Sequence, residues 1–154
     1  MHLITAPDKL EIHSPAIFLA GSIEQDKARK WQDVVIHQLQ HTSLTILNPR
    51  RAAWDASWQQ EKDFAPFHEQ VTWELNALEA ADIVLMYFDP KTKSPITLLE
   101  MGLFARSGKL MVCCPRGFWR KGNVDIDCDR FGITQTDTLE ELIREVQNKL
   151  IDAP

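Results

Sequence analysis

Short runs of apolar residues alternate along the chain with longer stretches in which apolar residues recur every three or four positions. The short runs predict buried strands at 16–20, 44–47, 83–88 and 110–114, with a short last strand near 132–134. The longer stretches predict helices at 23–41, 67–81, 95–107 and 138–151. Polar segments at 50–66 and 115–130 predict two irregular loops.

This alternation of strands and helices predicts an α/β protein with a parallel sheet covered by helices on both faces. We expect a doubly wound, flavodoxin-like (Rossmann-like) sheet of four or five strands in a three-layer α/β/α arrangement, as a single domain over 1–154. Ligands of such sheets bind at the carboxyl ends of the strands. The segments expected at that edge are 21–22, 48–51, 89–94 and 115–123.

Composition narrows the classes of function. The chain has 154 residues, 44% of them hydrophobic, and a net charge of −5, which argues against a binder of nucleic acid polymers. It contains no apolar run of about 18 residues and no signal-peptide pattern at its start, so we expect a cytoplasmic protein with no membrane contact. Cys113, Cys114 and Cys128 lack the C-x-x-C spacing of a metal site, and we interpret them as reduced, buried thiols without a metal.

Glu100 lies in an otherwise apolar segment, SPITLLEMGLFARSGK, at residues 94–109. Leu98, Leu99, Met101 and Leu103 around it would raise the pKa of its carboxyl or demand polar partners. Such a carboxylate suits attack on an anomeric carbon. The structural alternative is a capping box, with Thr97 as the N-cap and Glu100 three residues later.

Glu74 follows Gln70 by one helical turn, and both share a face beside the apolar stripe that we assign to Leu75, Leu78 and Ala81. Alone it is typical of a solvated helix glutamate. Paired with Glu100 it becomes a candidate general acid, because cleavage of a glycosidic bond needs one carboxyl to attack and another to protonate the leaving group.

Loop residues supply the candidate ligands for substrate. Gly21-Ser22 fits either a loop that approaches a phosphate or sugar or an ordinary tight turn with a serine cap. Two basic clusters fall at the same edge of the sheet and could hold a phosphate or carboxylate. Trp54, Trp58 and Trp119 fit either stacking on a base or anchoring of the loops. The basic clusters are Arg50-Arg51 and Arg116, Arg120, Lys121.

Together FLAGSIE, NPRR, WELNALEAADIVLMY and SPITLLEMGLFARSGK resemble the nucleoside 2-deoxyribosyltransferase-like family, over about residues 17–123. The chain is also similar to the 2′-deoxynucleoside 5′-monophosphate N-glycosidases. The resemblance implies a flavodoxin-like fold, a nucleophile at Glu100 and a general acid at Glu74, where the family usually has aspartate. Ser94, six residues before the nucleophile, matches the monophosphate glycosidases rather than the transferases.

Three further positions follow from the resemblance. A tyrosine typical of the first strand falls on Phe18, and an arginine of the glycosidases falls on Glu24. Asn123 lies about where family members offer a residue to the sugar of a neighbouring subunit. The full set of expected substrate-binding residues is Gly21, Ser22, Arg50, Arg51, Asp89, Ser94, Trp119 and Asn123.

We therefore expect an enzyme that cleaves or exchanges the N-glycosidic bond of a nucleoside or nucleotide through a covalent glycosyl-glutamate intermediate. It would be a hydrolase or transferase that needs no metal or redox cofactor, and the family's habit implies a homodimer or a larger symmetric assembly. An NAD-type glycohydrolase and a non-catalytic nucleotide sensor remain alternatives.

Overall fold

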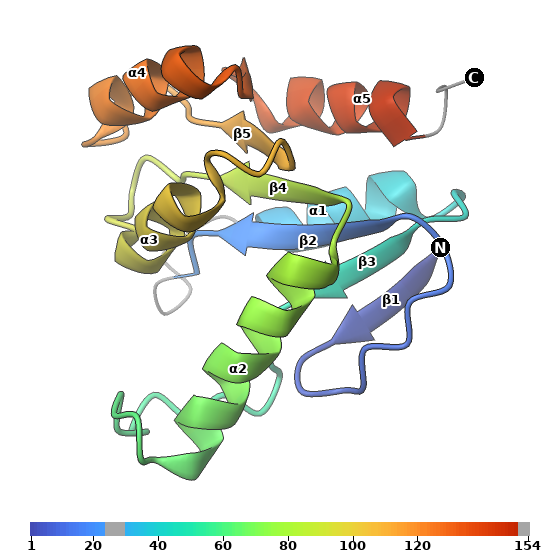
Figure 1. Ribbon diagram of the computed structural model, residues 1–154, viewed down its shortest axis with the longest axis vertical. Helices are drawn as coiled ribbons and strands as arrows, with labels where there is room; N and C mark the ends of the chain where they lie inside the picture. The colour runs from blue at the N-terminus through green and yellow to red at the C-terminus, as the bar shows by residue number, and fades with distance from the viewer. Residues whose placement is uncertain (24–29, 151–154) are drawn as a thin grey trace.

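Six parallel strands form one sheet in the computed structural model, which describes residues 1–23 and 30–150 (Figure 1). Their order across the sheet is β1-β3-β2-β4-β5-β6. The strands are β1 (His2–Thr5), β2 (Ala16–Gly21), β3 (Thr45–Asn48), β4 (Ile83–Tyr87), β5 (Leu110–Cys113) and β6 (Thr134–Thr136). The helices are α1 (Trp31–Leu39), α2 (Ala65–Ala80), α3 (Pro95–Phe104), α4 (Lys121–Phe131) and α5 (Leu139–Leu150).

Helices cover both faces of the sheet, so the architecture has three layers. One apolar cluster joins the sheet to α2, α3 and α4, through side chains such as Trp73, Met101 and Val124. The other joins the opposite face to α1 and α5, through side chains such as Trp31 and Leu142. The central strands are apolar along their length because both of their faces are buried. The predicted flavodoxin-like α/β/α fold is confirmed.

The order of β2 to β6 repeats the flavodoxin order, in which the second strand of the set lies outside the first. The chain runs outward from β2 to β3 and then returns past β2 to β4 (Figure 1). The carboxyl ends of β2 and β4, which are paired from Ile17↔Ile83 to Gly21↔Tyr87, therefore mark the switch point where ligands of this fold bind.

The sheet has one strand more than the four or five expected. The additional strand is β1, which pairs in parallel with β3 from His2↔Thr45 to Thr5↔Asn48. Its first two residues, His2 and Leu3, are exposed, so the segment carries no continuous apolar run. The short last strand is real and begins at Thr134, after Gly132 ends α4 in the left-handed conformation at φ 63°.

The expected loop over 115–130 is wrong in its second half, because Lys121–Phe131 forms α4. Only Val124 and Cys128 of this helix are buried, one turn apart, and its other residues are mostly polar. One buried position per turn is a weaker signal than the stripe of a typical amphipathic helix. The helix expected over 23–41 is found as Trp31–Leu39, and its earlier part falls largely on 24–29, outside the described residues.

Candidate active site

Gly21 ends β2 at the switch point, where no side chain would fit. A Cβ atom at this position would lie 2.5 Å from the Tyr87 carbonyl oxygen and 2.6 Å from a ring carbon of Trp31. Trp31 is held there by its indole, which donates a hydrogen bond to the Ser22 carbonyl at 3.0 Å. Glycine thus lets β2, β4 and α1 approach closely and delivers Ser22 to the edge of the sheet.

Three hydroxyls meet beside Gly21. Ser22 and Ser94 hydrogen-bond to one another, and Thr92 Oγ1 lies 2.8 Å from Ser22 Oγ and 2.7 Å from Ser94 Oγ. The backbone N–H of Asp89 also donates to Ser22 Oγ, at 3.1 Å. All four residues are buried. The hydroxyl cluster (Ser22, Thr92 and Ser94) joins the loop after β2 to the loop after β4.

Ser94 is the N-cap of α3 and has φ 49° and ψ 53°, a left-handed conformation that few non-glycine residues adopt. Backbone strain of this kind persists where the surroundings hold it, and it concentrates at functional sites. Here the hydrogen bonds to Ser22 and Thr92 hold Ser94. Because Pro95 is the first residue of α3, the capping box expected at Thr97 and Glu100 is wrong: Thr97 lies inside the helix.

Glu100 lies on the buried face of α3, together with Thr97 and Met101, and is 8% exposed. Leu99 and Leu103, which we expected around it, instead lie on the opposite face, each 60% exposed. Burial is the main cause that raises the pKa of Glu100, from an ordinary value of 4.5 to about 8, and the charge of Glu74 adds to it. No hydrogen bond reaches its carboxyl from residues 1–23 or 30–150.

Glu74 faces the same region from α2. Its carboxyl oxygen Oε1 accepts a hydrogen bond from Gln70 Nε2 at 2.8 Å. Burial raises the pKa of Glu74, and the hydrogen bond from Gln70 opposes that rise. The apolar stripe that we assigned to this helix is partly wrong, because Leu75 is 41% exposed and the buried face is instead formed by Gln70, Trp73, Ala77 and Leu78.

The two carboxyls are close enough for the charge of one to raise the pKa of the other. Interacting carboxyls of this kind release their protons in two steps that belong to the pair. In such a pair the charge of the first carboxylate opposes ionisation of the second, which favours one carboxylate beside one carboxylic acid. That combination is what displacement at an anomeric carbon uses, since one group attacks and the other protonates the leaving atom.

The basic residues expected to bind substrate include Arg50 and Arg51, in the loop after β3. Arg51 forms an ion pair with Glu69 at 2.7 Å, and its guanidinium lies 5.2 Å from the centre of the Trp58 ring. The backbone N–H of Arg50 donates to the Asn48 side chain at 3.1 Å. Trp58 also packs edge-on against Trp54, with ring centres 5.0 Å apart. These contacts anchor the loop after β3 to the start of α2.

Trp119 connects the loops after β4 and β5. Its indole donates to the Lys93 carbonyl at 2.9 Å, while Lys93 Nζ and the Arg120 guanidinium lie 4.5 and 4.3 Å from its ring centre. The ring is 46% exposed, so it also offers surface to a ligand. Asn123 is exposed on the first turn of α4. Glu24 lies outside the described residues, and Phe18 is fully buried in the core.

Thr92 and Gln70 are polar residues of this region that the sequence analysis did not assign to the site. Thr92 lies between Asp89 and Ser94, within a loop expected at the sheet edge, but a single hydroxyl in a loop carries no distinctive signal. Gln70 precedes Glu74 by four residues, a spacing that permits a side-chain hydrogen bond on a helix. That spacing was the available signal, and its meaning depended on the burial of both side chains.

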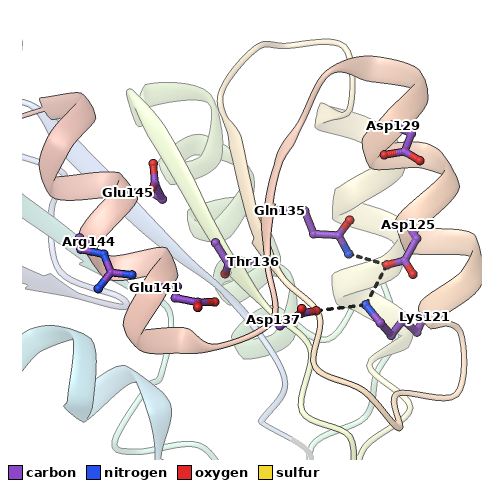
Figure 2. A pocket seen from close by; sticks show the side chains of 9 residues that line it. All are labelled: Lys121, Asp125, Asp129, Gln135, Thr136, Asp137, Glu141, Arg144 and Glu145. Carbon is purple, nitrogen blue, oxygen red and sulfur yellow. Dashed lines mark hydrogen bonds and ion pairs between the residues drawn. The ribbon is translucent and has the colours of Figure 1, made fainter.

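A cavity lies elsewhere, between α4, β6 and α5 (Figure 2). It is open, measures about 540 Å³, and carries five carboxylates and two cations among its lining residues. Lys121 bridges Asp125 at 3.0 Å and Asp137 at 3.7 Å, as the dashed lines in Figure 2 mark. Lys121 therefore belongs to this acidic cavity. Among the described residues, no group of three His, Cys, Asp or Glu could hold a metal ion.

The structure thus combines two interacting carboxyls, on α2 and α3, with a buried hydroxyl cluster at the switch point of a flavodoxin-like sheet. A sequence model described as "Nucleoside 2-deoxyribosyltransferase like" matches residues 14–118. The chain belongs to this family. Membership suggests the transfer or cleavage of nucleoside glycosyl groups.

The fold is shared with a solved structure described as a conserved protein from Enterococcus faecalis V583. The TM-score is 0.61 and the sequence identity 13%, with 90% of this chain and 100% of that chain covered. No curated protein matches the chain. Among the described residues, none of the helices has the length and apolar character needed to cross a membrane.

Proposed function

We propose that the protein is an enzyme that cleaves or exchanges the N-glycosidic bond of a nucleoside or nucleotide, with Glu100 as nucleophile and Glu74 as general acid. The observation that carries this proposal is the position of Glu100, which is 8% exposed on the buried face of α3 and close enough to Glu74 to sense its charge. Two carboxyls that share about one proton supply the attacking and the protonating group together.

In the first step a Glu100 oxygen forms a bond to C1′ of the sugar while the bond from C1′ to the base nitrogen breaks. The electron pair of that bond stays on the base, which takes a proton from Glu74. In the second step water or another base attacks C1′ and frees the Glu100 carboxylate, and the ionised Glu74 accepts the proton that the attacking group loses. Two displacements retain the configuration at C1′.

The resting protein favours the proton on Glu100, because Gln70 donates a hydrogen bond to Glu74 and stabilises its charged form. A sugar that develops positive charge at C1′ favours the ionised form of Glu100. Substrate binding would therefore move the shared proton toward Glu74 and the base. This requirement makes the rate sensitive to the total proton count of the pair rather than to either group alone.

The hydroxyl cluster would receive the sugar or a 5′-phosphate. Ser22 and Ser94 lie at the amino end of α3, where backbone N–H groups and the helix dipole favour an anion. Gly21 and the backbone of Asp89 line the same turn. Arg50 and Arg51 would lie on the β3 side of the substrate and Trp119 on the β5 side, as ligands for phosphate or as a surface for the base.

A second copy of the chain would cover the exposed face of α3. Ile96, Leu99 and Leu103 lie on that face, each about 60% exposed, on the helix that also carries Glu100. Three exposed apolar side chains at helical spacing favour burial against another protein surface. A symmetric dimer would also allow Asn123 of one copy to approach the sugar bound by the other.

A non-catalytic nucleotide sensor is the second candidate. It is favoured by the absence of a tyrosine hydroxyl at Phe18, which is buried in the core, and by the longer side chain at Glu74 where the family usually has aspartate. Such a protein would bind a nucleotide tightly without releasing the base.

The test is incubation with a panel of deoxynucleosides, ribonucleosides, nucleoside monophosphates and NAD, with free base measured by chromatography. We expect base release from at least one deoxynucleoside or its monophosphate, and none from Glu100→Gln. Release from NAD alone would indicate the glycohydrolase alternative. Tight binding with no release by the wild type would indicate the sensor, and undiminished release by Glu100→Gln would refute the assignment of the nucleophile.

A further inference from the structure

Gln70 is a buried amide that forms or breaks no bond in the two displacements above. It lies on α2 one turn before Glu74 and is 4% exposed. Its nitrogen Nε2 donates to the Pro49 carbonyl at the end of β3 and to Glu74 Oε1, both at 2.8 Å. One side chain therefore connects the edge of the sheet to the carboxyl of the candidate general acid.

The orientation of the amide is fixed by its neighbours. The Pro49 carbonyl can only accept, so the amide nitrogen must face it, and the other N–H of the same nitrogen is donated to Glu74 Oε1. The Gln70 oxygen Oε1 is buried and has no hydrogen-bond partner within 1–23 and 30–150. A buried amide with an unpaired oxygen is a net cost to folding, which an apolar side chain of the same size would avoid.

The contact also determines which oxygen of Glu74 can carry a proton. Oε1 accepts from Gln70, so a proton on that oxygen would compete with the hydrogen bond. The proton of the neutral carboxyl therefore resides on Oε2, the oxygen without this contact. An acid that protonates a leaving base must present its proton at one defined atom, since proton transfer requires hydrogen-bond geometry.

We propose that Gln70 is a positioning residue, which holds Glu74 against the end of β3 and assigns the transferable proton to Glu74 Oε2. The part that concerns proton transfer rests on the proposed function, whereas the hydrogen-bonded arrangement stands without it. Gln70 also makes Glu74 a stronger acid, because its N–H stabilises the carboxylate.

Few charged groups of the described residues offset the effect of Gln70 on the pKa of Glu74. Glu100 of α3 is the titratable group that interacts with Glu74 across the site. Glu69, beside Gln70 on α2, is neutralised by its ion pair with Arg51 of the loop after β3. Pro49 contributes an uncharged carbonyl. Burial thus raises the pKa of Glu74, and Gln70 is the neutral donor that opposes this rise.

The variant that tests this role is Gln70→Met, which keeps the length of the side chain and removes its donor and acceptor. The chain provides a matched control in Gln32→Met. Gln32 also lies on a helix, is 1% exposed, and has neither side-chain polar atom paired among the described residues. Any general effect of replacing a buried glutamine by methionine appears in both variants.

For Gln70→Met we expect kcat to fall about tenfold, the effect of losing one hydrogen bond to a charged group, with KM changed less than about twofold. The pKa of Glu74, followed by ¹³C NMR of its carboxyl carbon, should rise, and the alkaline limb of the rate profile should move to higher pH. In Gln32→Met the pKa of Glu74 and the alkaline limb of the rate profile should match those of the wild type. Equal behaviour of the two variants would overturn the proposal.

The NMR titration separates this proposal from the proposed function. A raised Glu74 pKa in Gln70→Met, in a protein that releases no base from any substrate, would keep the arrangement and refute the enzyme. If Gln70→Met does not fold, the wild type provides the test: the Gln70 side-chain N–H resonances should shift with the titration of Glu74 and lose that dependence in Glu74→Gln. Resonances indifferent to the Glu74 titration would refute the contact.

Discussion

Two acidic regions of the molecule differ in how their carboxyls are surrounded. In the open cavity between α4 and α5, burial tends to raise the pKa of Asp125, but hydrogen bonds from Gln135 and Lys121 and the charge of Lys121 hold it below its ordinary value. At the switch point, burial and the charge of Glu74 raise the pKa of Glu100 to about 8. The first region stabilises the charged form of Asp125, whereas the second favours the neutral form of Glu100.

The difference favours the carboxyl pair, rather than the open cavity, as the place of the proposed chemistry. The cavity in Figure 2 is open and measures about 540 Å³, and Lys121 forms ion pairs there with Asp125 and Asp137. Around Glu100 and Glu74, burial stores free energy in two groups that resist ionisation. Perturbed pKa values cluster at functional sites, and this supports the roles proposed for the two carboxyls.

The largest difference between the regions should appear in turnover. Glu100→Gln removes the attacking oxygen and should lower kcat by at least about a thousandfold, since the alternative path lacks the covalent intermediate. Asp125→Asn in the open cavity should change kcat by less than about twofold, as expected for a residue remote from the reaction. Comparable losses in the two variants, measured by base release, would remove the distinction between the regions.

The next effect concerns stability and pH. The pKa of Glu100 rises from 4.5 to about 8 on folding, so the folded protein binds the extra proton between these values and loses stability as the pH rises through that window. Glu100→Gln abolishes this loss. Relative to the wild type it should gain about 4 kcal/mol in the free energy of unfolding between pH 5 and pH 9. Urea unfolding at both values measures the gain, and a difference that stays constant with pH would count against a buried, ionisable Glu100.

A steric comparison follows. Gly21→Ala places a methyl group 2.5 Å from the Tyr87 carbonyl and 2.6 Å from Trp31, and should cost about 3 kcal/mol. Gly122→Ala, in α4 beside the open cavity, meets nothing within 4 Å and should stabilise the protein by about 0.5 kcal/mol through helix propensity. Thermal unfolding distinguishes them. A neutral Gly21→Ala would mean that β2, α1 and β4 approach less closely than the structure has them.

The smallest expected effect concerns Trp119, in the loop between β5 and α4. Trp119→Phe keeps an aromatic ring beside Lys93 and Arg120 but removes the hydrogen bond from the indole to the Lys93 carbonyl. Losing one neutral hydrogen bond that anchors the loop before Ser94 should cost about 1 kcal/mol, seen as a severalfold higher KM with kcat almost unchanged. A large fall in kcat instead would indicate that Trp119 takes part in the chemical step.

Much of the fold follows from local patterns in the sequence. Four of the strands carry continuous apolar runs, as burial on both faces requires. Such runs can be recognised without knowing where the neighbouring helices end. β1 lacks such a run, because its position at the edge of the sheet leaves His2 and Leu3 exposed. α4 buries only Val124 and Cys128, so its helical period is nearly invisible in the sequence.

The segments that form the candidate site were predictable from the sequence, but the side chains that surround Glu100 were not. The apolar neighbours of Glu100 in sequence indicated burial, yet Leu99 and Leu103 lie on the exposed face of α3. Its pKa is set first by burial in the folded protein and then by the charge of Glu74 on α2. Likewise the hydrogen bonds of Thr92 and Gln70 depend on tertiary contacts with Ser22, which follows β2, and with Pro49, which follows β3; no local pattern encodes them.

The most direct test is a ¹³C NMR titration of the Glu100 carboxyl in the wild type and in Glu74→Gln. We expect Glu100 to titrate near pH 8 in the wild type. In Glu74→Gln its pKa should fall, because the neighbouring negative charge is gone. A Glu100 that titrates near its ordinary value of 4.5, unchanged by Glu74→Gln, would show that the two carboxyls do not form a pair and would contradict the account.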